Sequence, residues 1–536
     1  MGIYYSGNKK EDKDNIIITE PQAEEAAEIK SENTVNIADN DIRQRIYNKI
    51  KEFKPYLYIA GFMLFAFTLI DPAALKLDVK IIEFYTLAIV IALIAFLATA
   101  LYYKKITPQK AVMLIIIIGL VMRVAYALYT PYGVRQHDLG GFFGKGHDSY
   151  IYYIMTKFSL PADNVAQFYQ PPLHHFLAAV WGKILTLFGA SYERAFEGIQ
   201  MLTMFYSAAV MVISYRIFKL IKLSDNAMIL AMSIICLHPS FFIIGGSINN
   251  DMLMILFGYI IVLYTIRWYN EPNIKNTVVL AVALGLCMMA KTAGIIFAVV
   301  IAIVFIIKWI NLEKPFTQRA LFGKFALFGG ISIPLGMWYF VRNLIMFKQP
   351  FGYIQPIPKS MPDYIGMHNP IERYFTIPLQ QFTGYLYCKP IQGDYNIYAY
   401  ILKCSVFGEF SYGGVDFQAR MLLIFNILVV LLSLASLIYI WLYDKREETY
   451  IYRLILTLVW AAQMISYIFY TTNQAYSCAM DFRFLVPAIL TGCAFLGYGT
   501  DVMKQNHNKI WKIIRYPVYA TVAGFCLSSI FMYLSI

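Results

Sequence analysis

The chain has 536 residues, of which 59% are hydrophobic and 15% are charged, and its net charge at pH 7 is +12. Soluble globular proteins are about 45–50% apolar and about 25% charged, so this composition excludes an ordinary soluble protein. From residue 55 to the end, apolar runs recur. Each is about 20 residues long, the length that an α-helix needs to cross a bilayer. We therefore expect an all-α polytopic membrane protein.

The first 50 residues differ from the rest of the chain. They contain seven Lys or Arg and ten Asp or Glu, so this tail carries −3 and the remainder +15. The tail has no apolar segment, and its mixture of Glu, Lys, Asn and Ala predicts a mostly disordered cytoplasmic extension. A basic membrane domain usually owes its charge to cytoplasmic loop anchors, so the charge does not indicate a nucleic-acid partner.

After the tail, the apolar runs predict about thirteen spanning helices. The first two form an extra N-terminal hairpin over residues 51–104, and residues 105–536 form the main membrane domain. In chain order the predicted spans cover roughly 55–72, 80–103, 111–129, 196–220, 227–246, 251–269, 277–291, 293–310, 322–343, 421–443, 452–470, 484–500 and 515–535.

The distribution of Lys and Arg orients these helices, because cytoplasmic loops carry an excess of positive charge. The loops between spans fit this rule when the N-terminus lies in the cytoplasm. Counting residues 171–189 as a further span would move the basic residues of 216–222 outside. We therefore predict that 171–189 is an amphipathic helix on the outer membrane face. Two large segments, about 130–195 and about 344–420, then lie outside.

The first outer segment is rich in polar side chains. Residues 130–153 read TPYGVRQHDLGGFFGKGHDSYIYY and include Arg135, His137, Asp138 and Asp148. Functional residues concentrate in loops, although a solvated hydrophilic loop is the alternative interpretation. A divalent metal is also an option, because imidazole and carboxylate suit zinc or manganese. Further polar residues follow along the segment: Tyr169, Gln170, His174 and His175.

Other polar groups lie at the outer ends of the predicted spans. The stretch HPSFFIIGGSINNDML contains Asn250 and Asp251, for which helix capping is the alternative interpretation. Lys291 lies between two apolar runs, where a cation so close to hydrocarbon predicts a functional site. Arg342 ends one span and Arg483 begins a late one. In the predicted topology, carboxylates and cations thus meet at one membrane face.

This combination of groups suits the transfer of a sugar from a lipid phosphate. The leaving group is an anionic phosphate, whose growing charge Arg or Lys can stabilise. The acceptor hydroxyl must lose a proton, and an Asp carboxylate can accept it as a general base. The residues at the outer face supply both kinds of group.

The order of the motifs resembles a known superfamily. An Arg-x-His-Asp loop is followed by GHDSYIYY, YQPPLHHFLAA, GGSINND, the lysine between two spans, Arg-Asn after a span, and a late FRFLVP. Over residues 105–500 this order resembles the GT-C glycosyltransferases of the bacterial and archaeal protein O-mannosyltransferase and aminoarabinose-transferase superfamily. The resemblance implies a GT-C-type fold with two large extracytoplasmic loop regions. The hairpin at 51–104 has no counterpart in it.

The resemblance also implies an activity. The chain would be a hexosyl- or pentosyltransferase of the cell membrane that takes sugar from a polyprenyl-phosphate donor at the outer face, with inversion at the anomeric carbon. The acidic catalytic residue of the first outer loop matches Asp138, and Asp148 is the competing candidate. Where many members have Asp-Glu, this chain has His137-Asp138, so His137 stands in place of an acid.

Cations and polar side chains of the same motifs are implied to bind substrate. Arg483 matches the contact to the donor phosphate, and Lys291 and Arg342 are further candidates. Such enzymes have another acidic residue further along the chain, and Asp251 is similar to it in position. The predicted substrate contacts are Arg135, Tyr169, Gln170, His174, Asn250 and Asp251. No motif requires a cofactor, and a divalent metal stays an option.

The second outer segment, 344–420, is rich in Tyr, Pro and Gly, and we interpret it as a lid that rests on the lipid headgroups. Within it, Cys388 and Cys404 could form a disulfide if the compartment is oxidising.

Two other functions stay open. A polysaccharide polymerase or ligase shares many spans and a large outer loop, but usually concentrates its function in one late loop. A transporter or flippase would have polar residues near the middle of several spans and often an internal repeat. Polar groups at one face favour the transferase. Its acceptor hydroxyl could belong to a glycan, a lipid or a protein, and membrane lipids surround the chain.

Overall fold

The computed structural model describes residue 44 and residues 54–63, 78–312, 315–388 and 394–536. The chain divides into two units, Met1–Tyr58 and Ile59–Ile536, and the second contains all the elements named below. Among the described residues of this unit, regular structure is helical, and the one extended pairing is an isolated bridge between Tyr364 and Tyr476. The predicted all-α class is confirmed.

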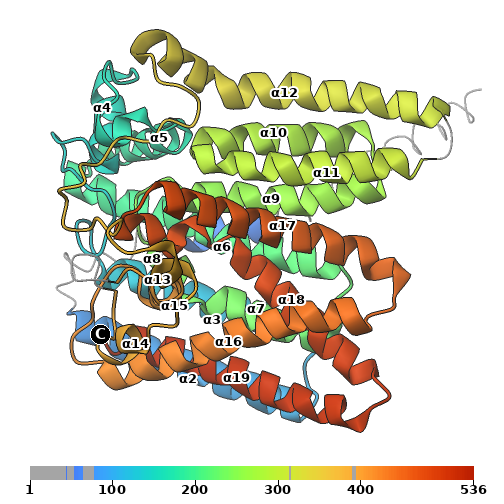
Figure 1. Cartoon of the computed structure of the whole chain (residues 1–536). Helices are drawn as coiled ribbons and strands as arrows, with labels where there is room; N and C mark the ends of the chain where they lie inside the picture. The colour runs from blue at the N-terminus through green and yellow to red at the C-terminus, as the bar shows by residue number, and fades with distance from the viewer. Residues whose placement is uncertain (1–43, 45–53, 64–77, 313–314, 389–393) are drawn as a thin grey trace, which may run out of the picture. The chain divides into compact units, whose positions relative to one another are not determined.

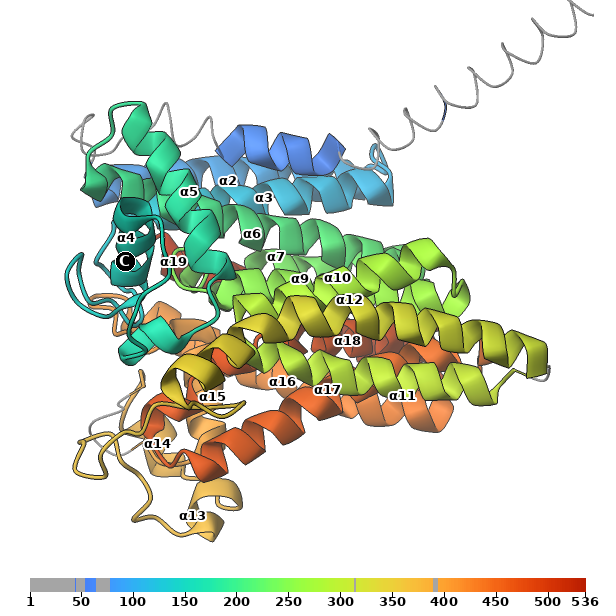
Figure 2. The same cartoon turned by 90° about the horizontal axis from the view of Figure 1, so that it is seen from above.

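Long helices lie side by side and form the body of this unit (Figures 1 and 2). Helix α10 packs against α9 and α12, α16 packs against α18 and α19, and α3 packs against α7. Their bounds are α2 Val79–Tyr102, α3 Pro108–Tyr129, α6 Tyr192–Leu220, α7 Asp225–Leu237, α9 Asp251–Asn270, α10 Ile274–Ala290, α11 Ile296–Ile310, α12 Pro315–Phe347, α16 Asp416–Tyr443, α17 Glu447–Asn473, α18 Ala488–Gln505 and α19 Lys509–Tyr533.

Within the described part of the chain, nine helices are long and apolar enough to cross a membrane. Helices α7 and α10 are apolar but shorter than 18 residues. The chain is therefore a multi-pass membrane protein, whereas the predicted count of about thirteen spans is not confirmed. The first predicted span, 55–72, lies partly outside the described residues.

One predicted span is wrong as a single helix. The run 227–246 is divided into α7, which ends at Leu237, and the short α8, Pro239–Ile243. Proline has no backbone N–H and disfavours helical conformation in the residue before it, so α7 ends at this point. The buried Arg123 guanidinium of α3 then donates to the Cys236 carbonyl at 2.6 Å, which satisfies an end carbonyl of α7.

Short helices gather at one end of the bundle, on the left in Figure 1. The predicted helix within 171–189 is present as α5, Leu173–Leu187. Its exposed apolar side chains are Phe176, Val180, Ile184 and Leu187, whose spacing of three or four residues places them on one face. The other short helices are α4 His147–Lys157, α13 Pro370–Tyr374, α14 Leu379–Thr383 and α15 Ile397–Phe407.

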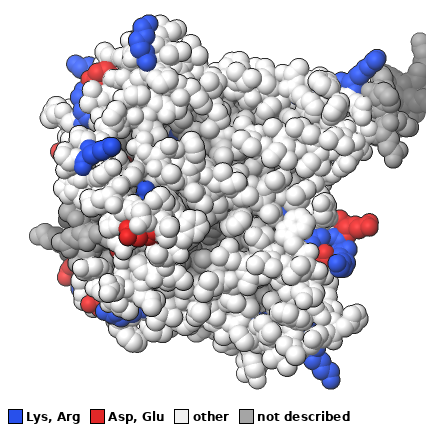
Figure 3. Space-filling model, in the orientation of Figure 1, with Lys and Arg blue, Asp and Glu red and all other residues white. Residues whose placement is uncertain are grey.

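The surface of the bundle agrees with a membrane environment. On the face shown in Figure 3, Lys, Arg, Asp and Glu side chains gather toward the two ends of the helices, and the band between them is free of charged side chains. Charged side chains are costly in the hydrocarbon of a bilayer, and an apolar surface of this extent would be unfavourable in water. The short helices and their connecting loops lie at one end of this apolar band (Figure 2).

Candidate active site

The loop between α3 and α4 is folded around the carboxylate of Asp148. Oδ1 of Asp148 accepts the backbone N–H groups of Gly140 and Ser149, each at 2.8 Å. Oδ2 accepts the Gly141 N–H and the Tyr132 hydroxyl, also at 2.8 Å each. The Ser149 hydroxyl also donates to Oδ1, at 3.4 Å. With five donors and a fully buried position, this carboxylate organises the loop.

Two glycines allow the loop to close. A Cβ atom on Gly146 would lie 2.1 Å from the Gly140 nitrogen, and one on Gly140 would lie 2.5 Å from the Gly146 nitrogen. A side chain at either position is therefore excluded by backbone. Across the closed loop, the backbone N–H of His147 donates to the Asp138 carbonyl at 3.0 Å. The start of α4 thus fixes the position of Asp138.

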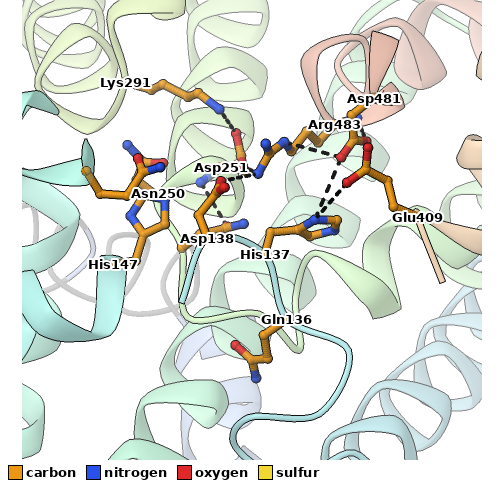
Figure 4. A network of polar contacts seen from close by, with 12 residues as sticks. Gln136, His137, Asp138, His147, Asn250, Asp251, Lys291, Glu409, Asp481 and Arg483 are labelled. Atoms are coloured by element: carbon orange, nitrogen blue, oxygen red, sulfur yellow. Dashed lines mark hydrogen bonds and ion pairs between the residues drawn. The ribbon is translucent and has the colours of Figure 1, made fainter. Parts of the chain in front are cut away.

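Asp138 forms an ion pair with a residue from the far end of the chain. Its φ is +57°, in the left-handed region, which Asp and Asn tolerate better than most residues. Oδ2 of Asp138 accepts a hydrogen bond from Nη1 of Arg483 at 2.7 Å (Figure 4). The Asp138 side chain is 35% exposed and that of Arg483 is 11% exposed, so Asp138 is the member of the pair that a substrate can reach.

The charge of Arg483 controls the protonation of Asp138. Burial alone would raise the pKa of the Asp138 carboxyl, but the guanidinium of Arg483 outweighs it and holds the pKa below its ordinary value. Asp138 is therefore ionised at neutral pH. While the ion pair persists, however, this carboxylate is a weak base.

Arg483 lies between several acids. It belongs to a short 3₁₀ helix, Phe482–Phe484, that precedes α18. Nε of Arg483 lies 3.3 Å from Oδ2 of Asp481, and Nη1 lies 4.0 Å from Oδ2 of Asp251. Figure 4 shows the guanidinium surrounded by carboxylates that come from different elements.

A second ion pair lies beside the first. Nζ of Lys291 donates to Oδ1 of Asp251, the first residue of α9. Lys291 immediately follows α10, as predicted for a lysine between two spans, and lies 4.6 Å from the centre of the Phe484 ring. His147 is close by, and burial lowers its pKa to about 3, so its imidazole is neutral at physiological pH.

On the other side of Arg483, a histidine faces two carboxylates. Nδ1 of His137 lies 3.6 Å from Oε2 of Glu409 and 3.9 Å from Oδ2 of Asp481. Burial would lower the pKa of His137, but the two acids outweigh it and raise the pKa above its ordinary value. Burial and the neighbouring Glu409 also raise the pKa of Asp481. In the described part of the chain, these three residues cluster closely enough to hold a metal ion.

The predicted contacts Tyr169 and Gln170 lie near the ion pairs. Tyr169 ends the 3₁₀ helix Ala166–Tyr169, and its hydroxyl accepts a hydrogen bond from Nε2 of Gln170 at 3.2 Å. Burial and then the Asp138 carboxylate raise the pKa of Tyr169 to about 12. The structure thus brings this part of the first outer segment to Asp138.

Two of the predicted arginines make their contacts elsewhere. Nη2 of Arg342, near the end of α12, donates to the Pro161 carbonyl at 2.8 Å. The Arg135 guanidinium stacks 4.6 Å from the centre of the Tyr412 ring, so it joins the first outer segment to the second. Both arginines therefore fasten loops to neighbouring elements.

His174 and Asn250 bond to backbone carbonyls. Nε2 of His174 lies 2.8 Å from the Ile248 carbonyl oxygen, and Nδ2 of Asn250 donates to the Ala290 carbonyl at 2.9 Å. Asn250 does not cap α9 through its side chain, so the capping interpretation is wrong for this residue. Its Oδ1 atom is buried and accepts no hydrogen bond within the described structure.

Sequence reasoning missed Glu409 altogether and left Asp481 without a role. Glu409 follows α15 in a stretch, FGEFSYGG, that contains no motif beyond its glycines. The signal for Asp481 was its position two residues before Arg483. Only the fold brings either residue to His137.

The two outer segments meet at the site. The rings of His137 and Phe410 lie 4.9 Å apart, which adds to the contacts of Glu409 and Tyr412 with the first segment. The disulfide that Cys388 and Cys404 could form in an oxidising compartment is not present in the structure, where both are free thiols. The thiol of Cys404 instead donates to Oδ1 of Asp481 at 3.1 Å.

Comparison with known proteins supports the predicted resemblance. Residues 170–334 match the family described as dolichyl-phosphate-mannose-protein mannosyltransferase. The matched region contains Asp251 and Lys291, but it includes neither Asp138 nor Arg483. The match confirms the resemblance to GT-C mannosyltransferases over this part of the chain. No curated protein sequence matches the chain.

Solved structures with similarity include oligosaccharyltransferases of Archaeoglobus fulgidus. The apo form is 14% identical, with a TM-score of 0.41, and the alignment covers 79% of this chain and 55% of that one. AglB in complex with an inhibitory peptide and a dolichol-phosphate is 12% identical, with a TM-score of 0.41 and coverages of 79% and 56%. The chain thus spans little more than half the length of these proteins.

Proposed function

We propose that this protein is a glycosyltransferase that moves a hexosyl or pentosyl group from a polyprenyl phosphate to an acceptor hydroxyl. The reaction takes place at the outer face of the cell membrane, with the N-terminus in the cytoplasm. The observation that carries the proposal is the ion pair between Asp138 and Arg483 at 2.7 Å, because a general base and a phosphate-binding cation are in contact. The family description of residues 170–334 names a donor of this class.

The ion pair between Asp138 and Arg483 suggests the order in which the two residues act. An incoming donor phosphate competes with Asp138 for the Arg483 guanidinium, which offers several N–H groups to an anion. Once Asp138 loses part of this contact, its pKa rises and it becomes a better base. Donor binding therefore activates the carboxylate that the resting ion pair keeps weak.

The chemical step is a single displacement. The acceptor oxygen forms a bond to the anomeric carbon while the bond from that carbon to the phosphate oxygen breaks. The hydroxyl proton goes to Asp138, and the electron pair of the broken bond leaves with the polyprenyl phosphate. Attack opposite the leaving group inverts the anomeric carbon.

Lys291 and Asp251 support the phosphate position. Asp251 bonds to Lys291 and lies 4.0 Å from Arg483, so it holds the two cations near each other. Two neighbouring cations can stabilise the charge that grows on a departing phosphate. The aromatic ring of Phe484, over which both cations lie at 4.6 and 5.1 Å, limits the water around them.

The proposal is tested by sugar transfer with the purified full-length protein in lipid nanodiscs. Labelled polyprenyl-phosphate sugars and nucleotide sugars are offered in parallel with membrane glycan, lipid and peptide acceptors. We expect acceptor-dependent release of polyprenyl phosphate from the lipid-linked donors only. Transfer from a nucleotide sugar would show that the donor class is wrong.

The matched variants are Asp138→Asn and Asp163→Asn. Asp163 lies in the same outer segment, but it forms an exposed ion pair with Lys145. We expect Asp138→Asn to lower transfer at least about a hundredfold and Asp163→Asn to retain it. Equal loss in both variants would mean that the assay reports the integrity of the loop rather than a base.

A further inference from the structure

The two outer segments and the connection between α17 and α18 each contribute one ligand-type atom to a common point. His137 comes from the loop before α4, Glu409 follows α15, and Asp481 precedes the 3₁₀ helix of Arg483. One ring nitrogen and two carboxylate oxygens lie within 4.8 Å of one another (Figure 4). Two ligands bound at about 2.1 Å to a tetrahedral ion are roughly 3.4 Å apart, close to the observed spacing of His137 from the two acids.

The remaining oxygen of each carboxylate is already held by the protein. The Tyr400 hydroxyl donates to Oε1 of Glu409 at 2.7 Å. Oδ1 of Asp481 accepts the Cys404 thiol at 3.1 Å and the backbone N–H of Arg483 at 2.9 Å. These contacts turn Oε2 of Glu409 and Oδ2 of Asp481 toward His137, in the way that outer contacts orient metal ligands.

The oxygen that faces His137 lacks a hydrogen bond. Asp481 is 2% exposed, and its Oδ2 atom is buried and accepts no hydrogen bond within the described structure. The nearest cationic atom, Nε of Arg483, is 3.3 Å away, and a carboxylate oxygen has a second lone pair for another partner. A buried acceptor of this kind normally has a partner.

Charge and space point to the same partner. Four acids, Asp138, Asp251, Glu409 and Asp481, surround two permanent cations, Lys291 and Arg483. Two negative charges are therefore uncompensated when the acids are ionised and His137 is neutral, which is the protonation state that binds a metal ion. A small cavity of ≈ 10 Å³ is lined by residues that include His137, Cys404, Asp481 and Arg483. This volume is about that of one water-sized sphere, so it accommodates a single ion or water molecule.

We propose that His137, Glu409 and Asp481 bind one divalent transition-metal ion, Zn²⁺ or Mn²⁺. One imidazole and two carboxylates are a ligand set that suits these ions. The ion compensates the two negative charges and links the two outer segments to the connection between α17 and α18. The proposal does not depend on the chemistry assigned to Asp138, because metal binding is measured without any sugar donor.

The experiment measures metal content in the purified full-length protein. Protein stripped with a chelator is reloaded with Zn²⁺ or Mn²⁺ at about ten micromolar, washed, and analysed by inductively coupled plasma mass spectrometry. We expect one ion per chain in the wild type and a loss of at least tenfold in Glu409→Gln and Asp481→Asn. A wild type without a bound ion, or variants with full occupancy, would overturn the proposal.

His368→Ala is the matched control. Nδ1 of His368 lies 3.4 Å from Oε2 of Glu372, so it resembles the His137–Glu409 pair but belongs to a partly exposed two-residue contact. We expect its metal content to equal that of the wild type. A loss in this variant would place the ion at His368 and overturn the proposal.

X-ray absorption of the zinc-loaded wild type keeps the proposal testable if the variants do not fold. We expect one imidazole nitrogen and oxygen ligands at about 2.0–2.2 Å. A shell with several imidazoles would indicate His147, His174 and His175 instead, since His147 and His175 already lie 2.9 Å apart. A shell without imidazole would equally overturn the proposal.

Discussion

Two aspartates of the same outer loop have opposite environments. Asp148 is fully buried, and its two oxygens accept three backbone N–H groups and two hydroxyls. Asp138 is one-third exposed, and the hydrogen bond to its carboxylate comes from the side chain of Arg483. The first carboxylate is fixed by the chain itself, whereas the second is held by a cation that a ligand can take over.

The difference separates loop formation from chemistry. Donors on the backbone cannot leave without unfolding the loop, so Asp148 is a poor candidate for a base. A side-chain cation can exchange one anion for another, so Asp138 can be released when phosphate binds. We therefore propose Asp138 as the base and a positioning role for Asp148.

The largest expected effect is that of Asp138→Asn on catalysis. Asparagine tolerates the left-handed backbone at this position but cannot accept the proton, so kcat should fall at least about a hundredfold. Donor binding should persist and become tighter, because the neutral amide competes less with the phosphate for Arg483, and the melting temperature should stay near that of the wild type. Normal transfer in Asp138→Asn, together with loss in Asp148→Asn, would exchange the two roles.

The next effect concerns donor affinity. Arg483→Ala removes charge-assisted hydrogen bonds of about 1.5–3 kcal/mol, so the Kd for a polyprenyl-phosphate sugar should rise roughly ten- to a hundredfold. Arg483→Lys should retain part of the affinity, because it keeps the charge but loses the bidentate geometry. Binding is measured by microscale thermophoresis. An unchanged Kd in the alanine variant would remove Arg483 from the phosphate site.

Asp148→Asn should act on stability. The amide nitrogen would face backbone N–H donors, so the free energy of unfolding of the loop should fall by about 1–3 kcal/mol. Tyr132→Phe removes one of the five donors and should cost less, about 0.5–1.5 kcal/mol. Thermal unfolding of both variants in the same detergent gives the ranking. A wild-type melting temperature in Asp148→Asn would contradict the positioning role.

The smallest effect is expected for Arg342→Gln. Its guanidinium bonds to the Pro161 carbonyl, and glutamine can replace part of that contact. Donor affinity should remain within about threefold of the wild type, and one hydrogen bond of about 0.5–1.5 kcal/mol should be lost from stability. A tenfold rise in donor Kd, measured beside Arg483→Lys, would return Arg342 to the phosphate site.

Most of the helices could be predicted from hydropathy and charge. The sidedness of Lys and Arg identified 171–189 as something other than a span, and α5 is present there as an amphipathic helix. The division of 227–246 was not predicted, because the apolar run continues through Pro239. The proline itself was the available signal. Helix α7 ends one residue before His238, the residue that precedes this proline.

The site could be predicted as a list of residues but not as an arrangement. Asp138 and Arg483 were identified from their motifs, yet nothing in the sequence shows that residues 345 positions apart share a hydrogen bond. Glu409 lies in a segment whose polar residues follow no period, so no pattern distinguished it. Its role depends on the packing of the second outer segment against the first.

The long sequence separation within the Asp138–Arg483 pair has a consequence for biosynthesis. Asp251 is followed by its partner after only 40 residues, but Asp138 is translated 345 residues before Arg483. At 5–20 residues per second, the ribosome needs roughly 17 to 70 s to cover that distance. During this time the nascent chain inserts most of its helices while Asp138 still lacks its cation. Under the function proposed above, catalytic competence would therefore arise only after Arg483 has left the ribosome, so that shorter nascent chains would not consume donor lipid.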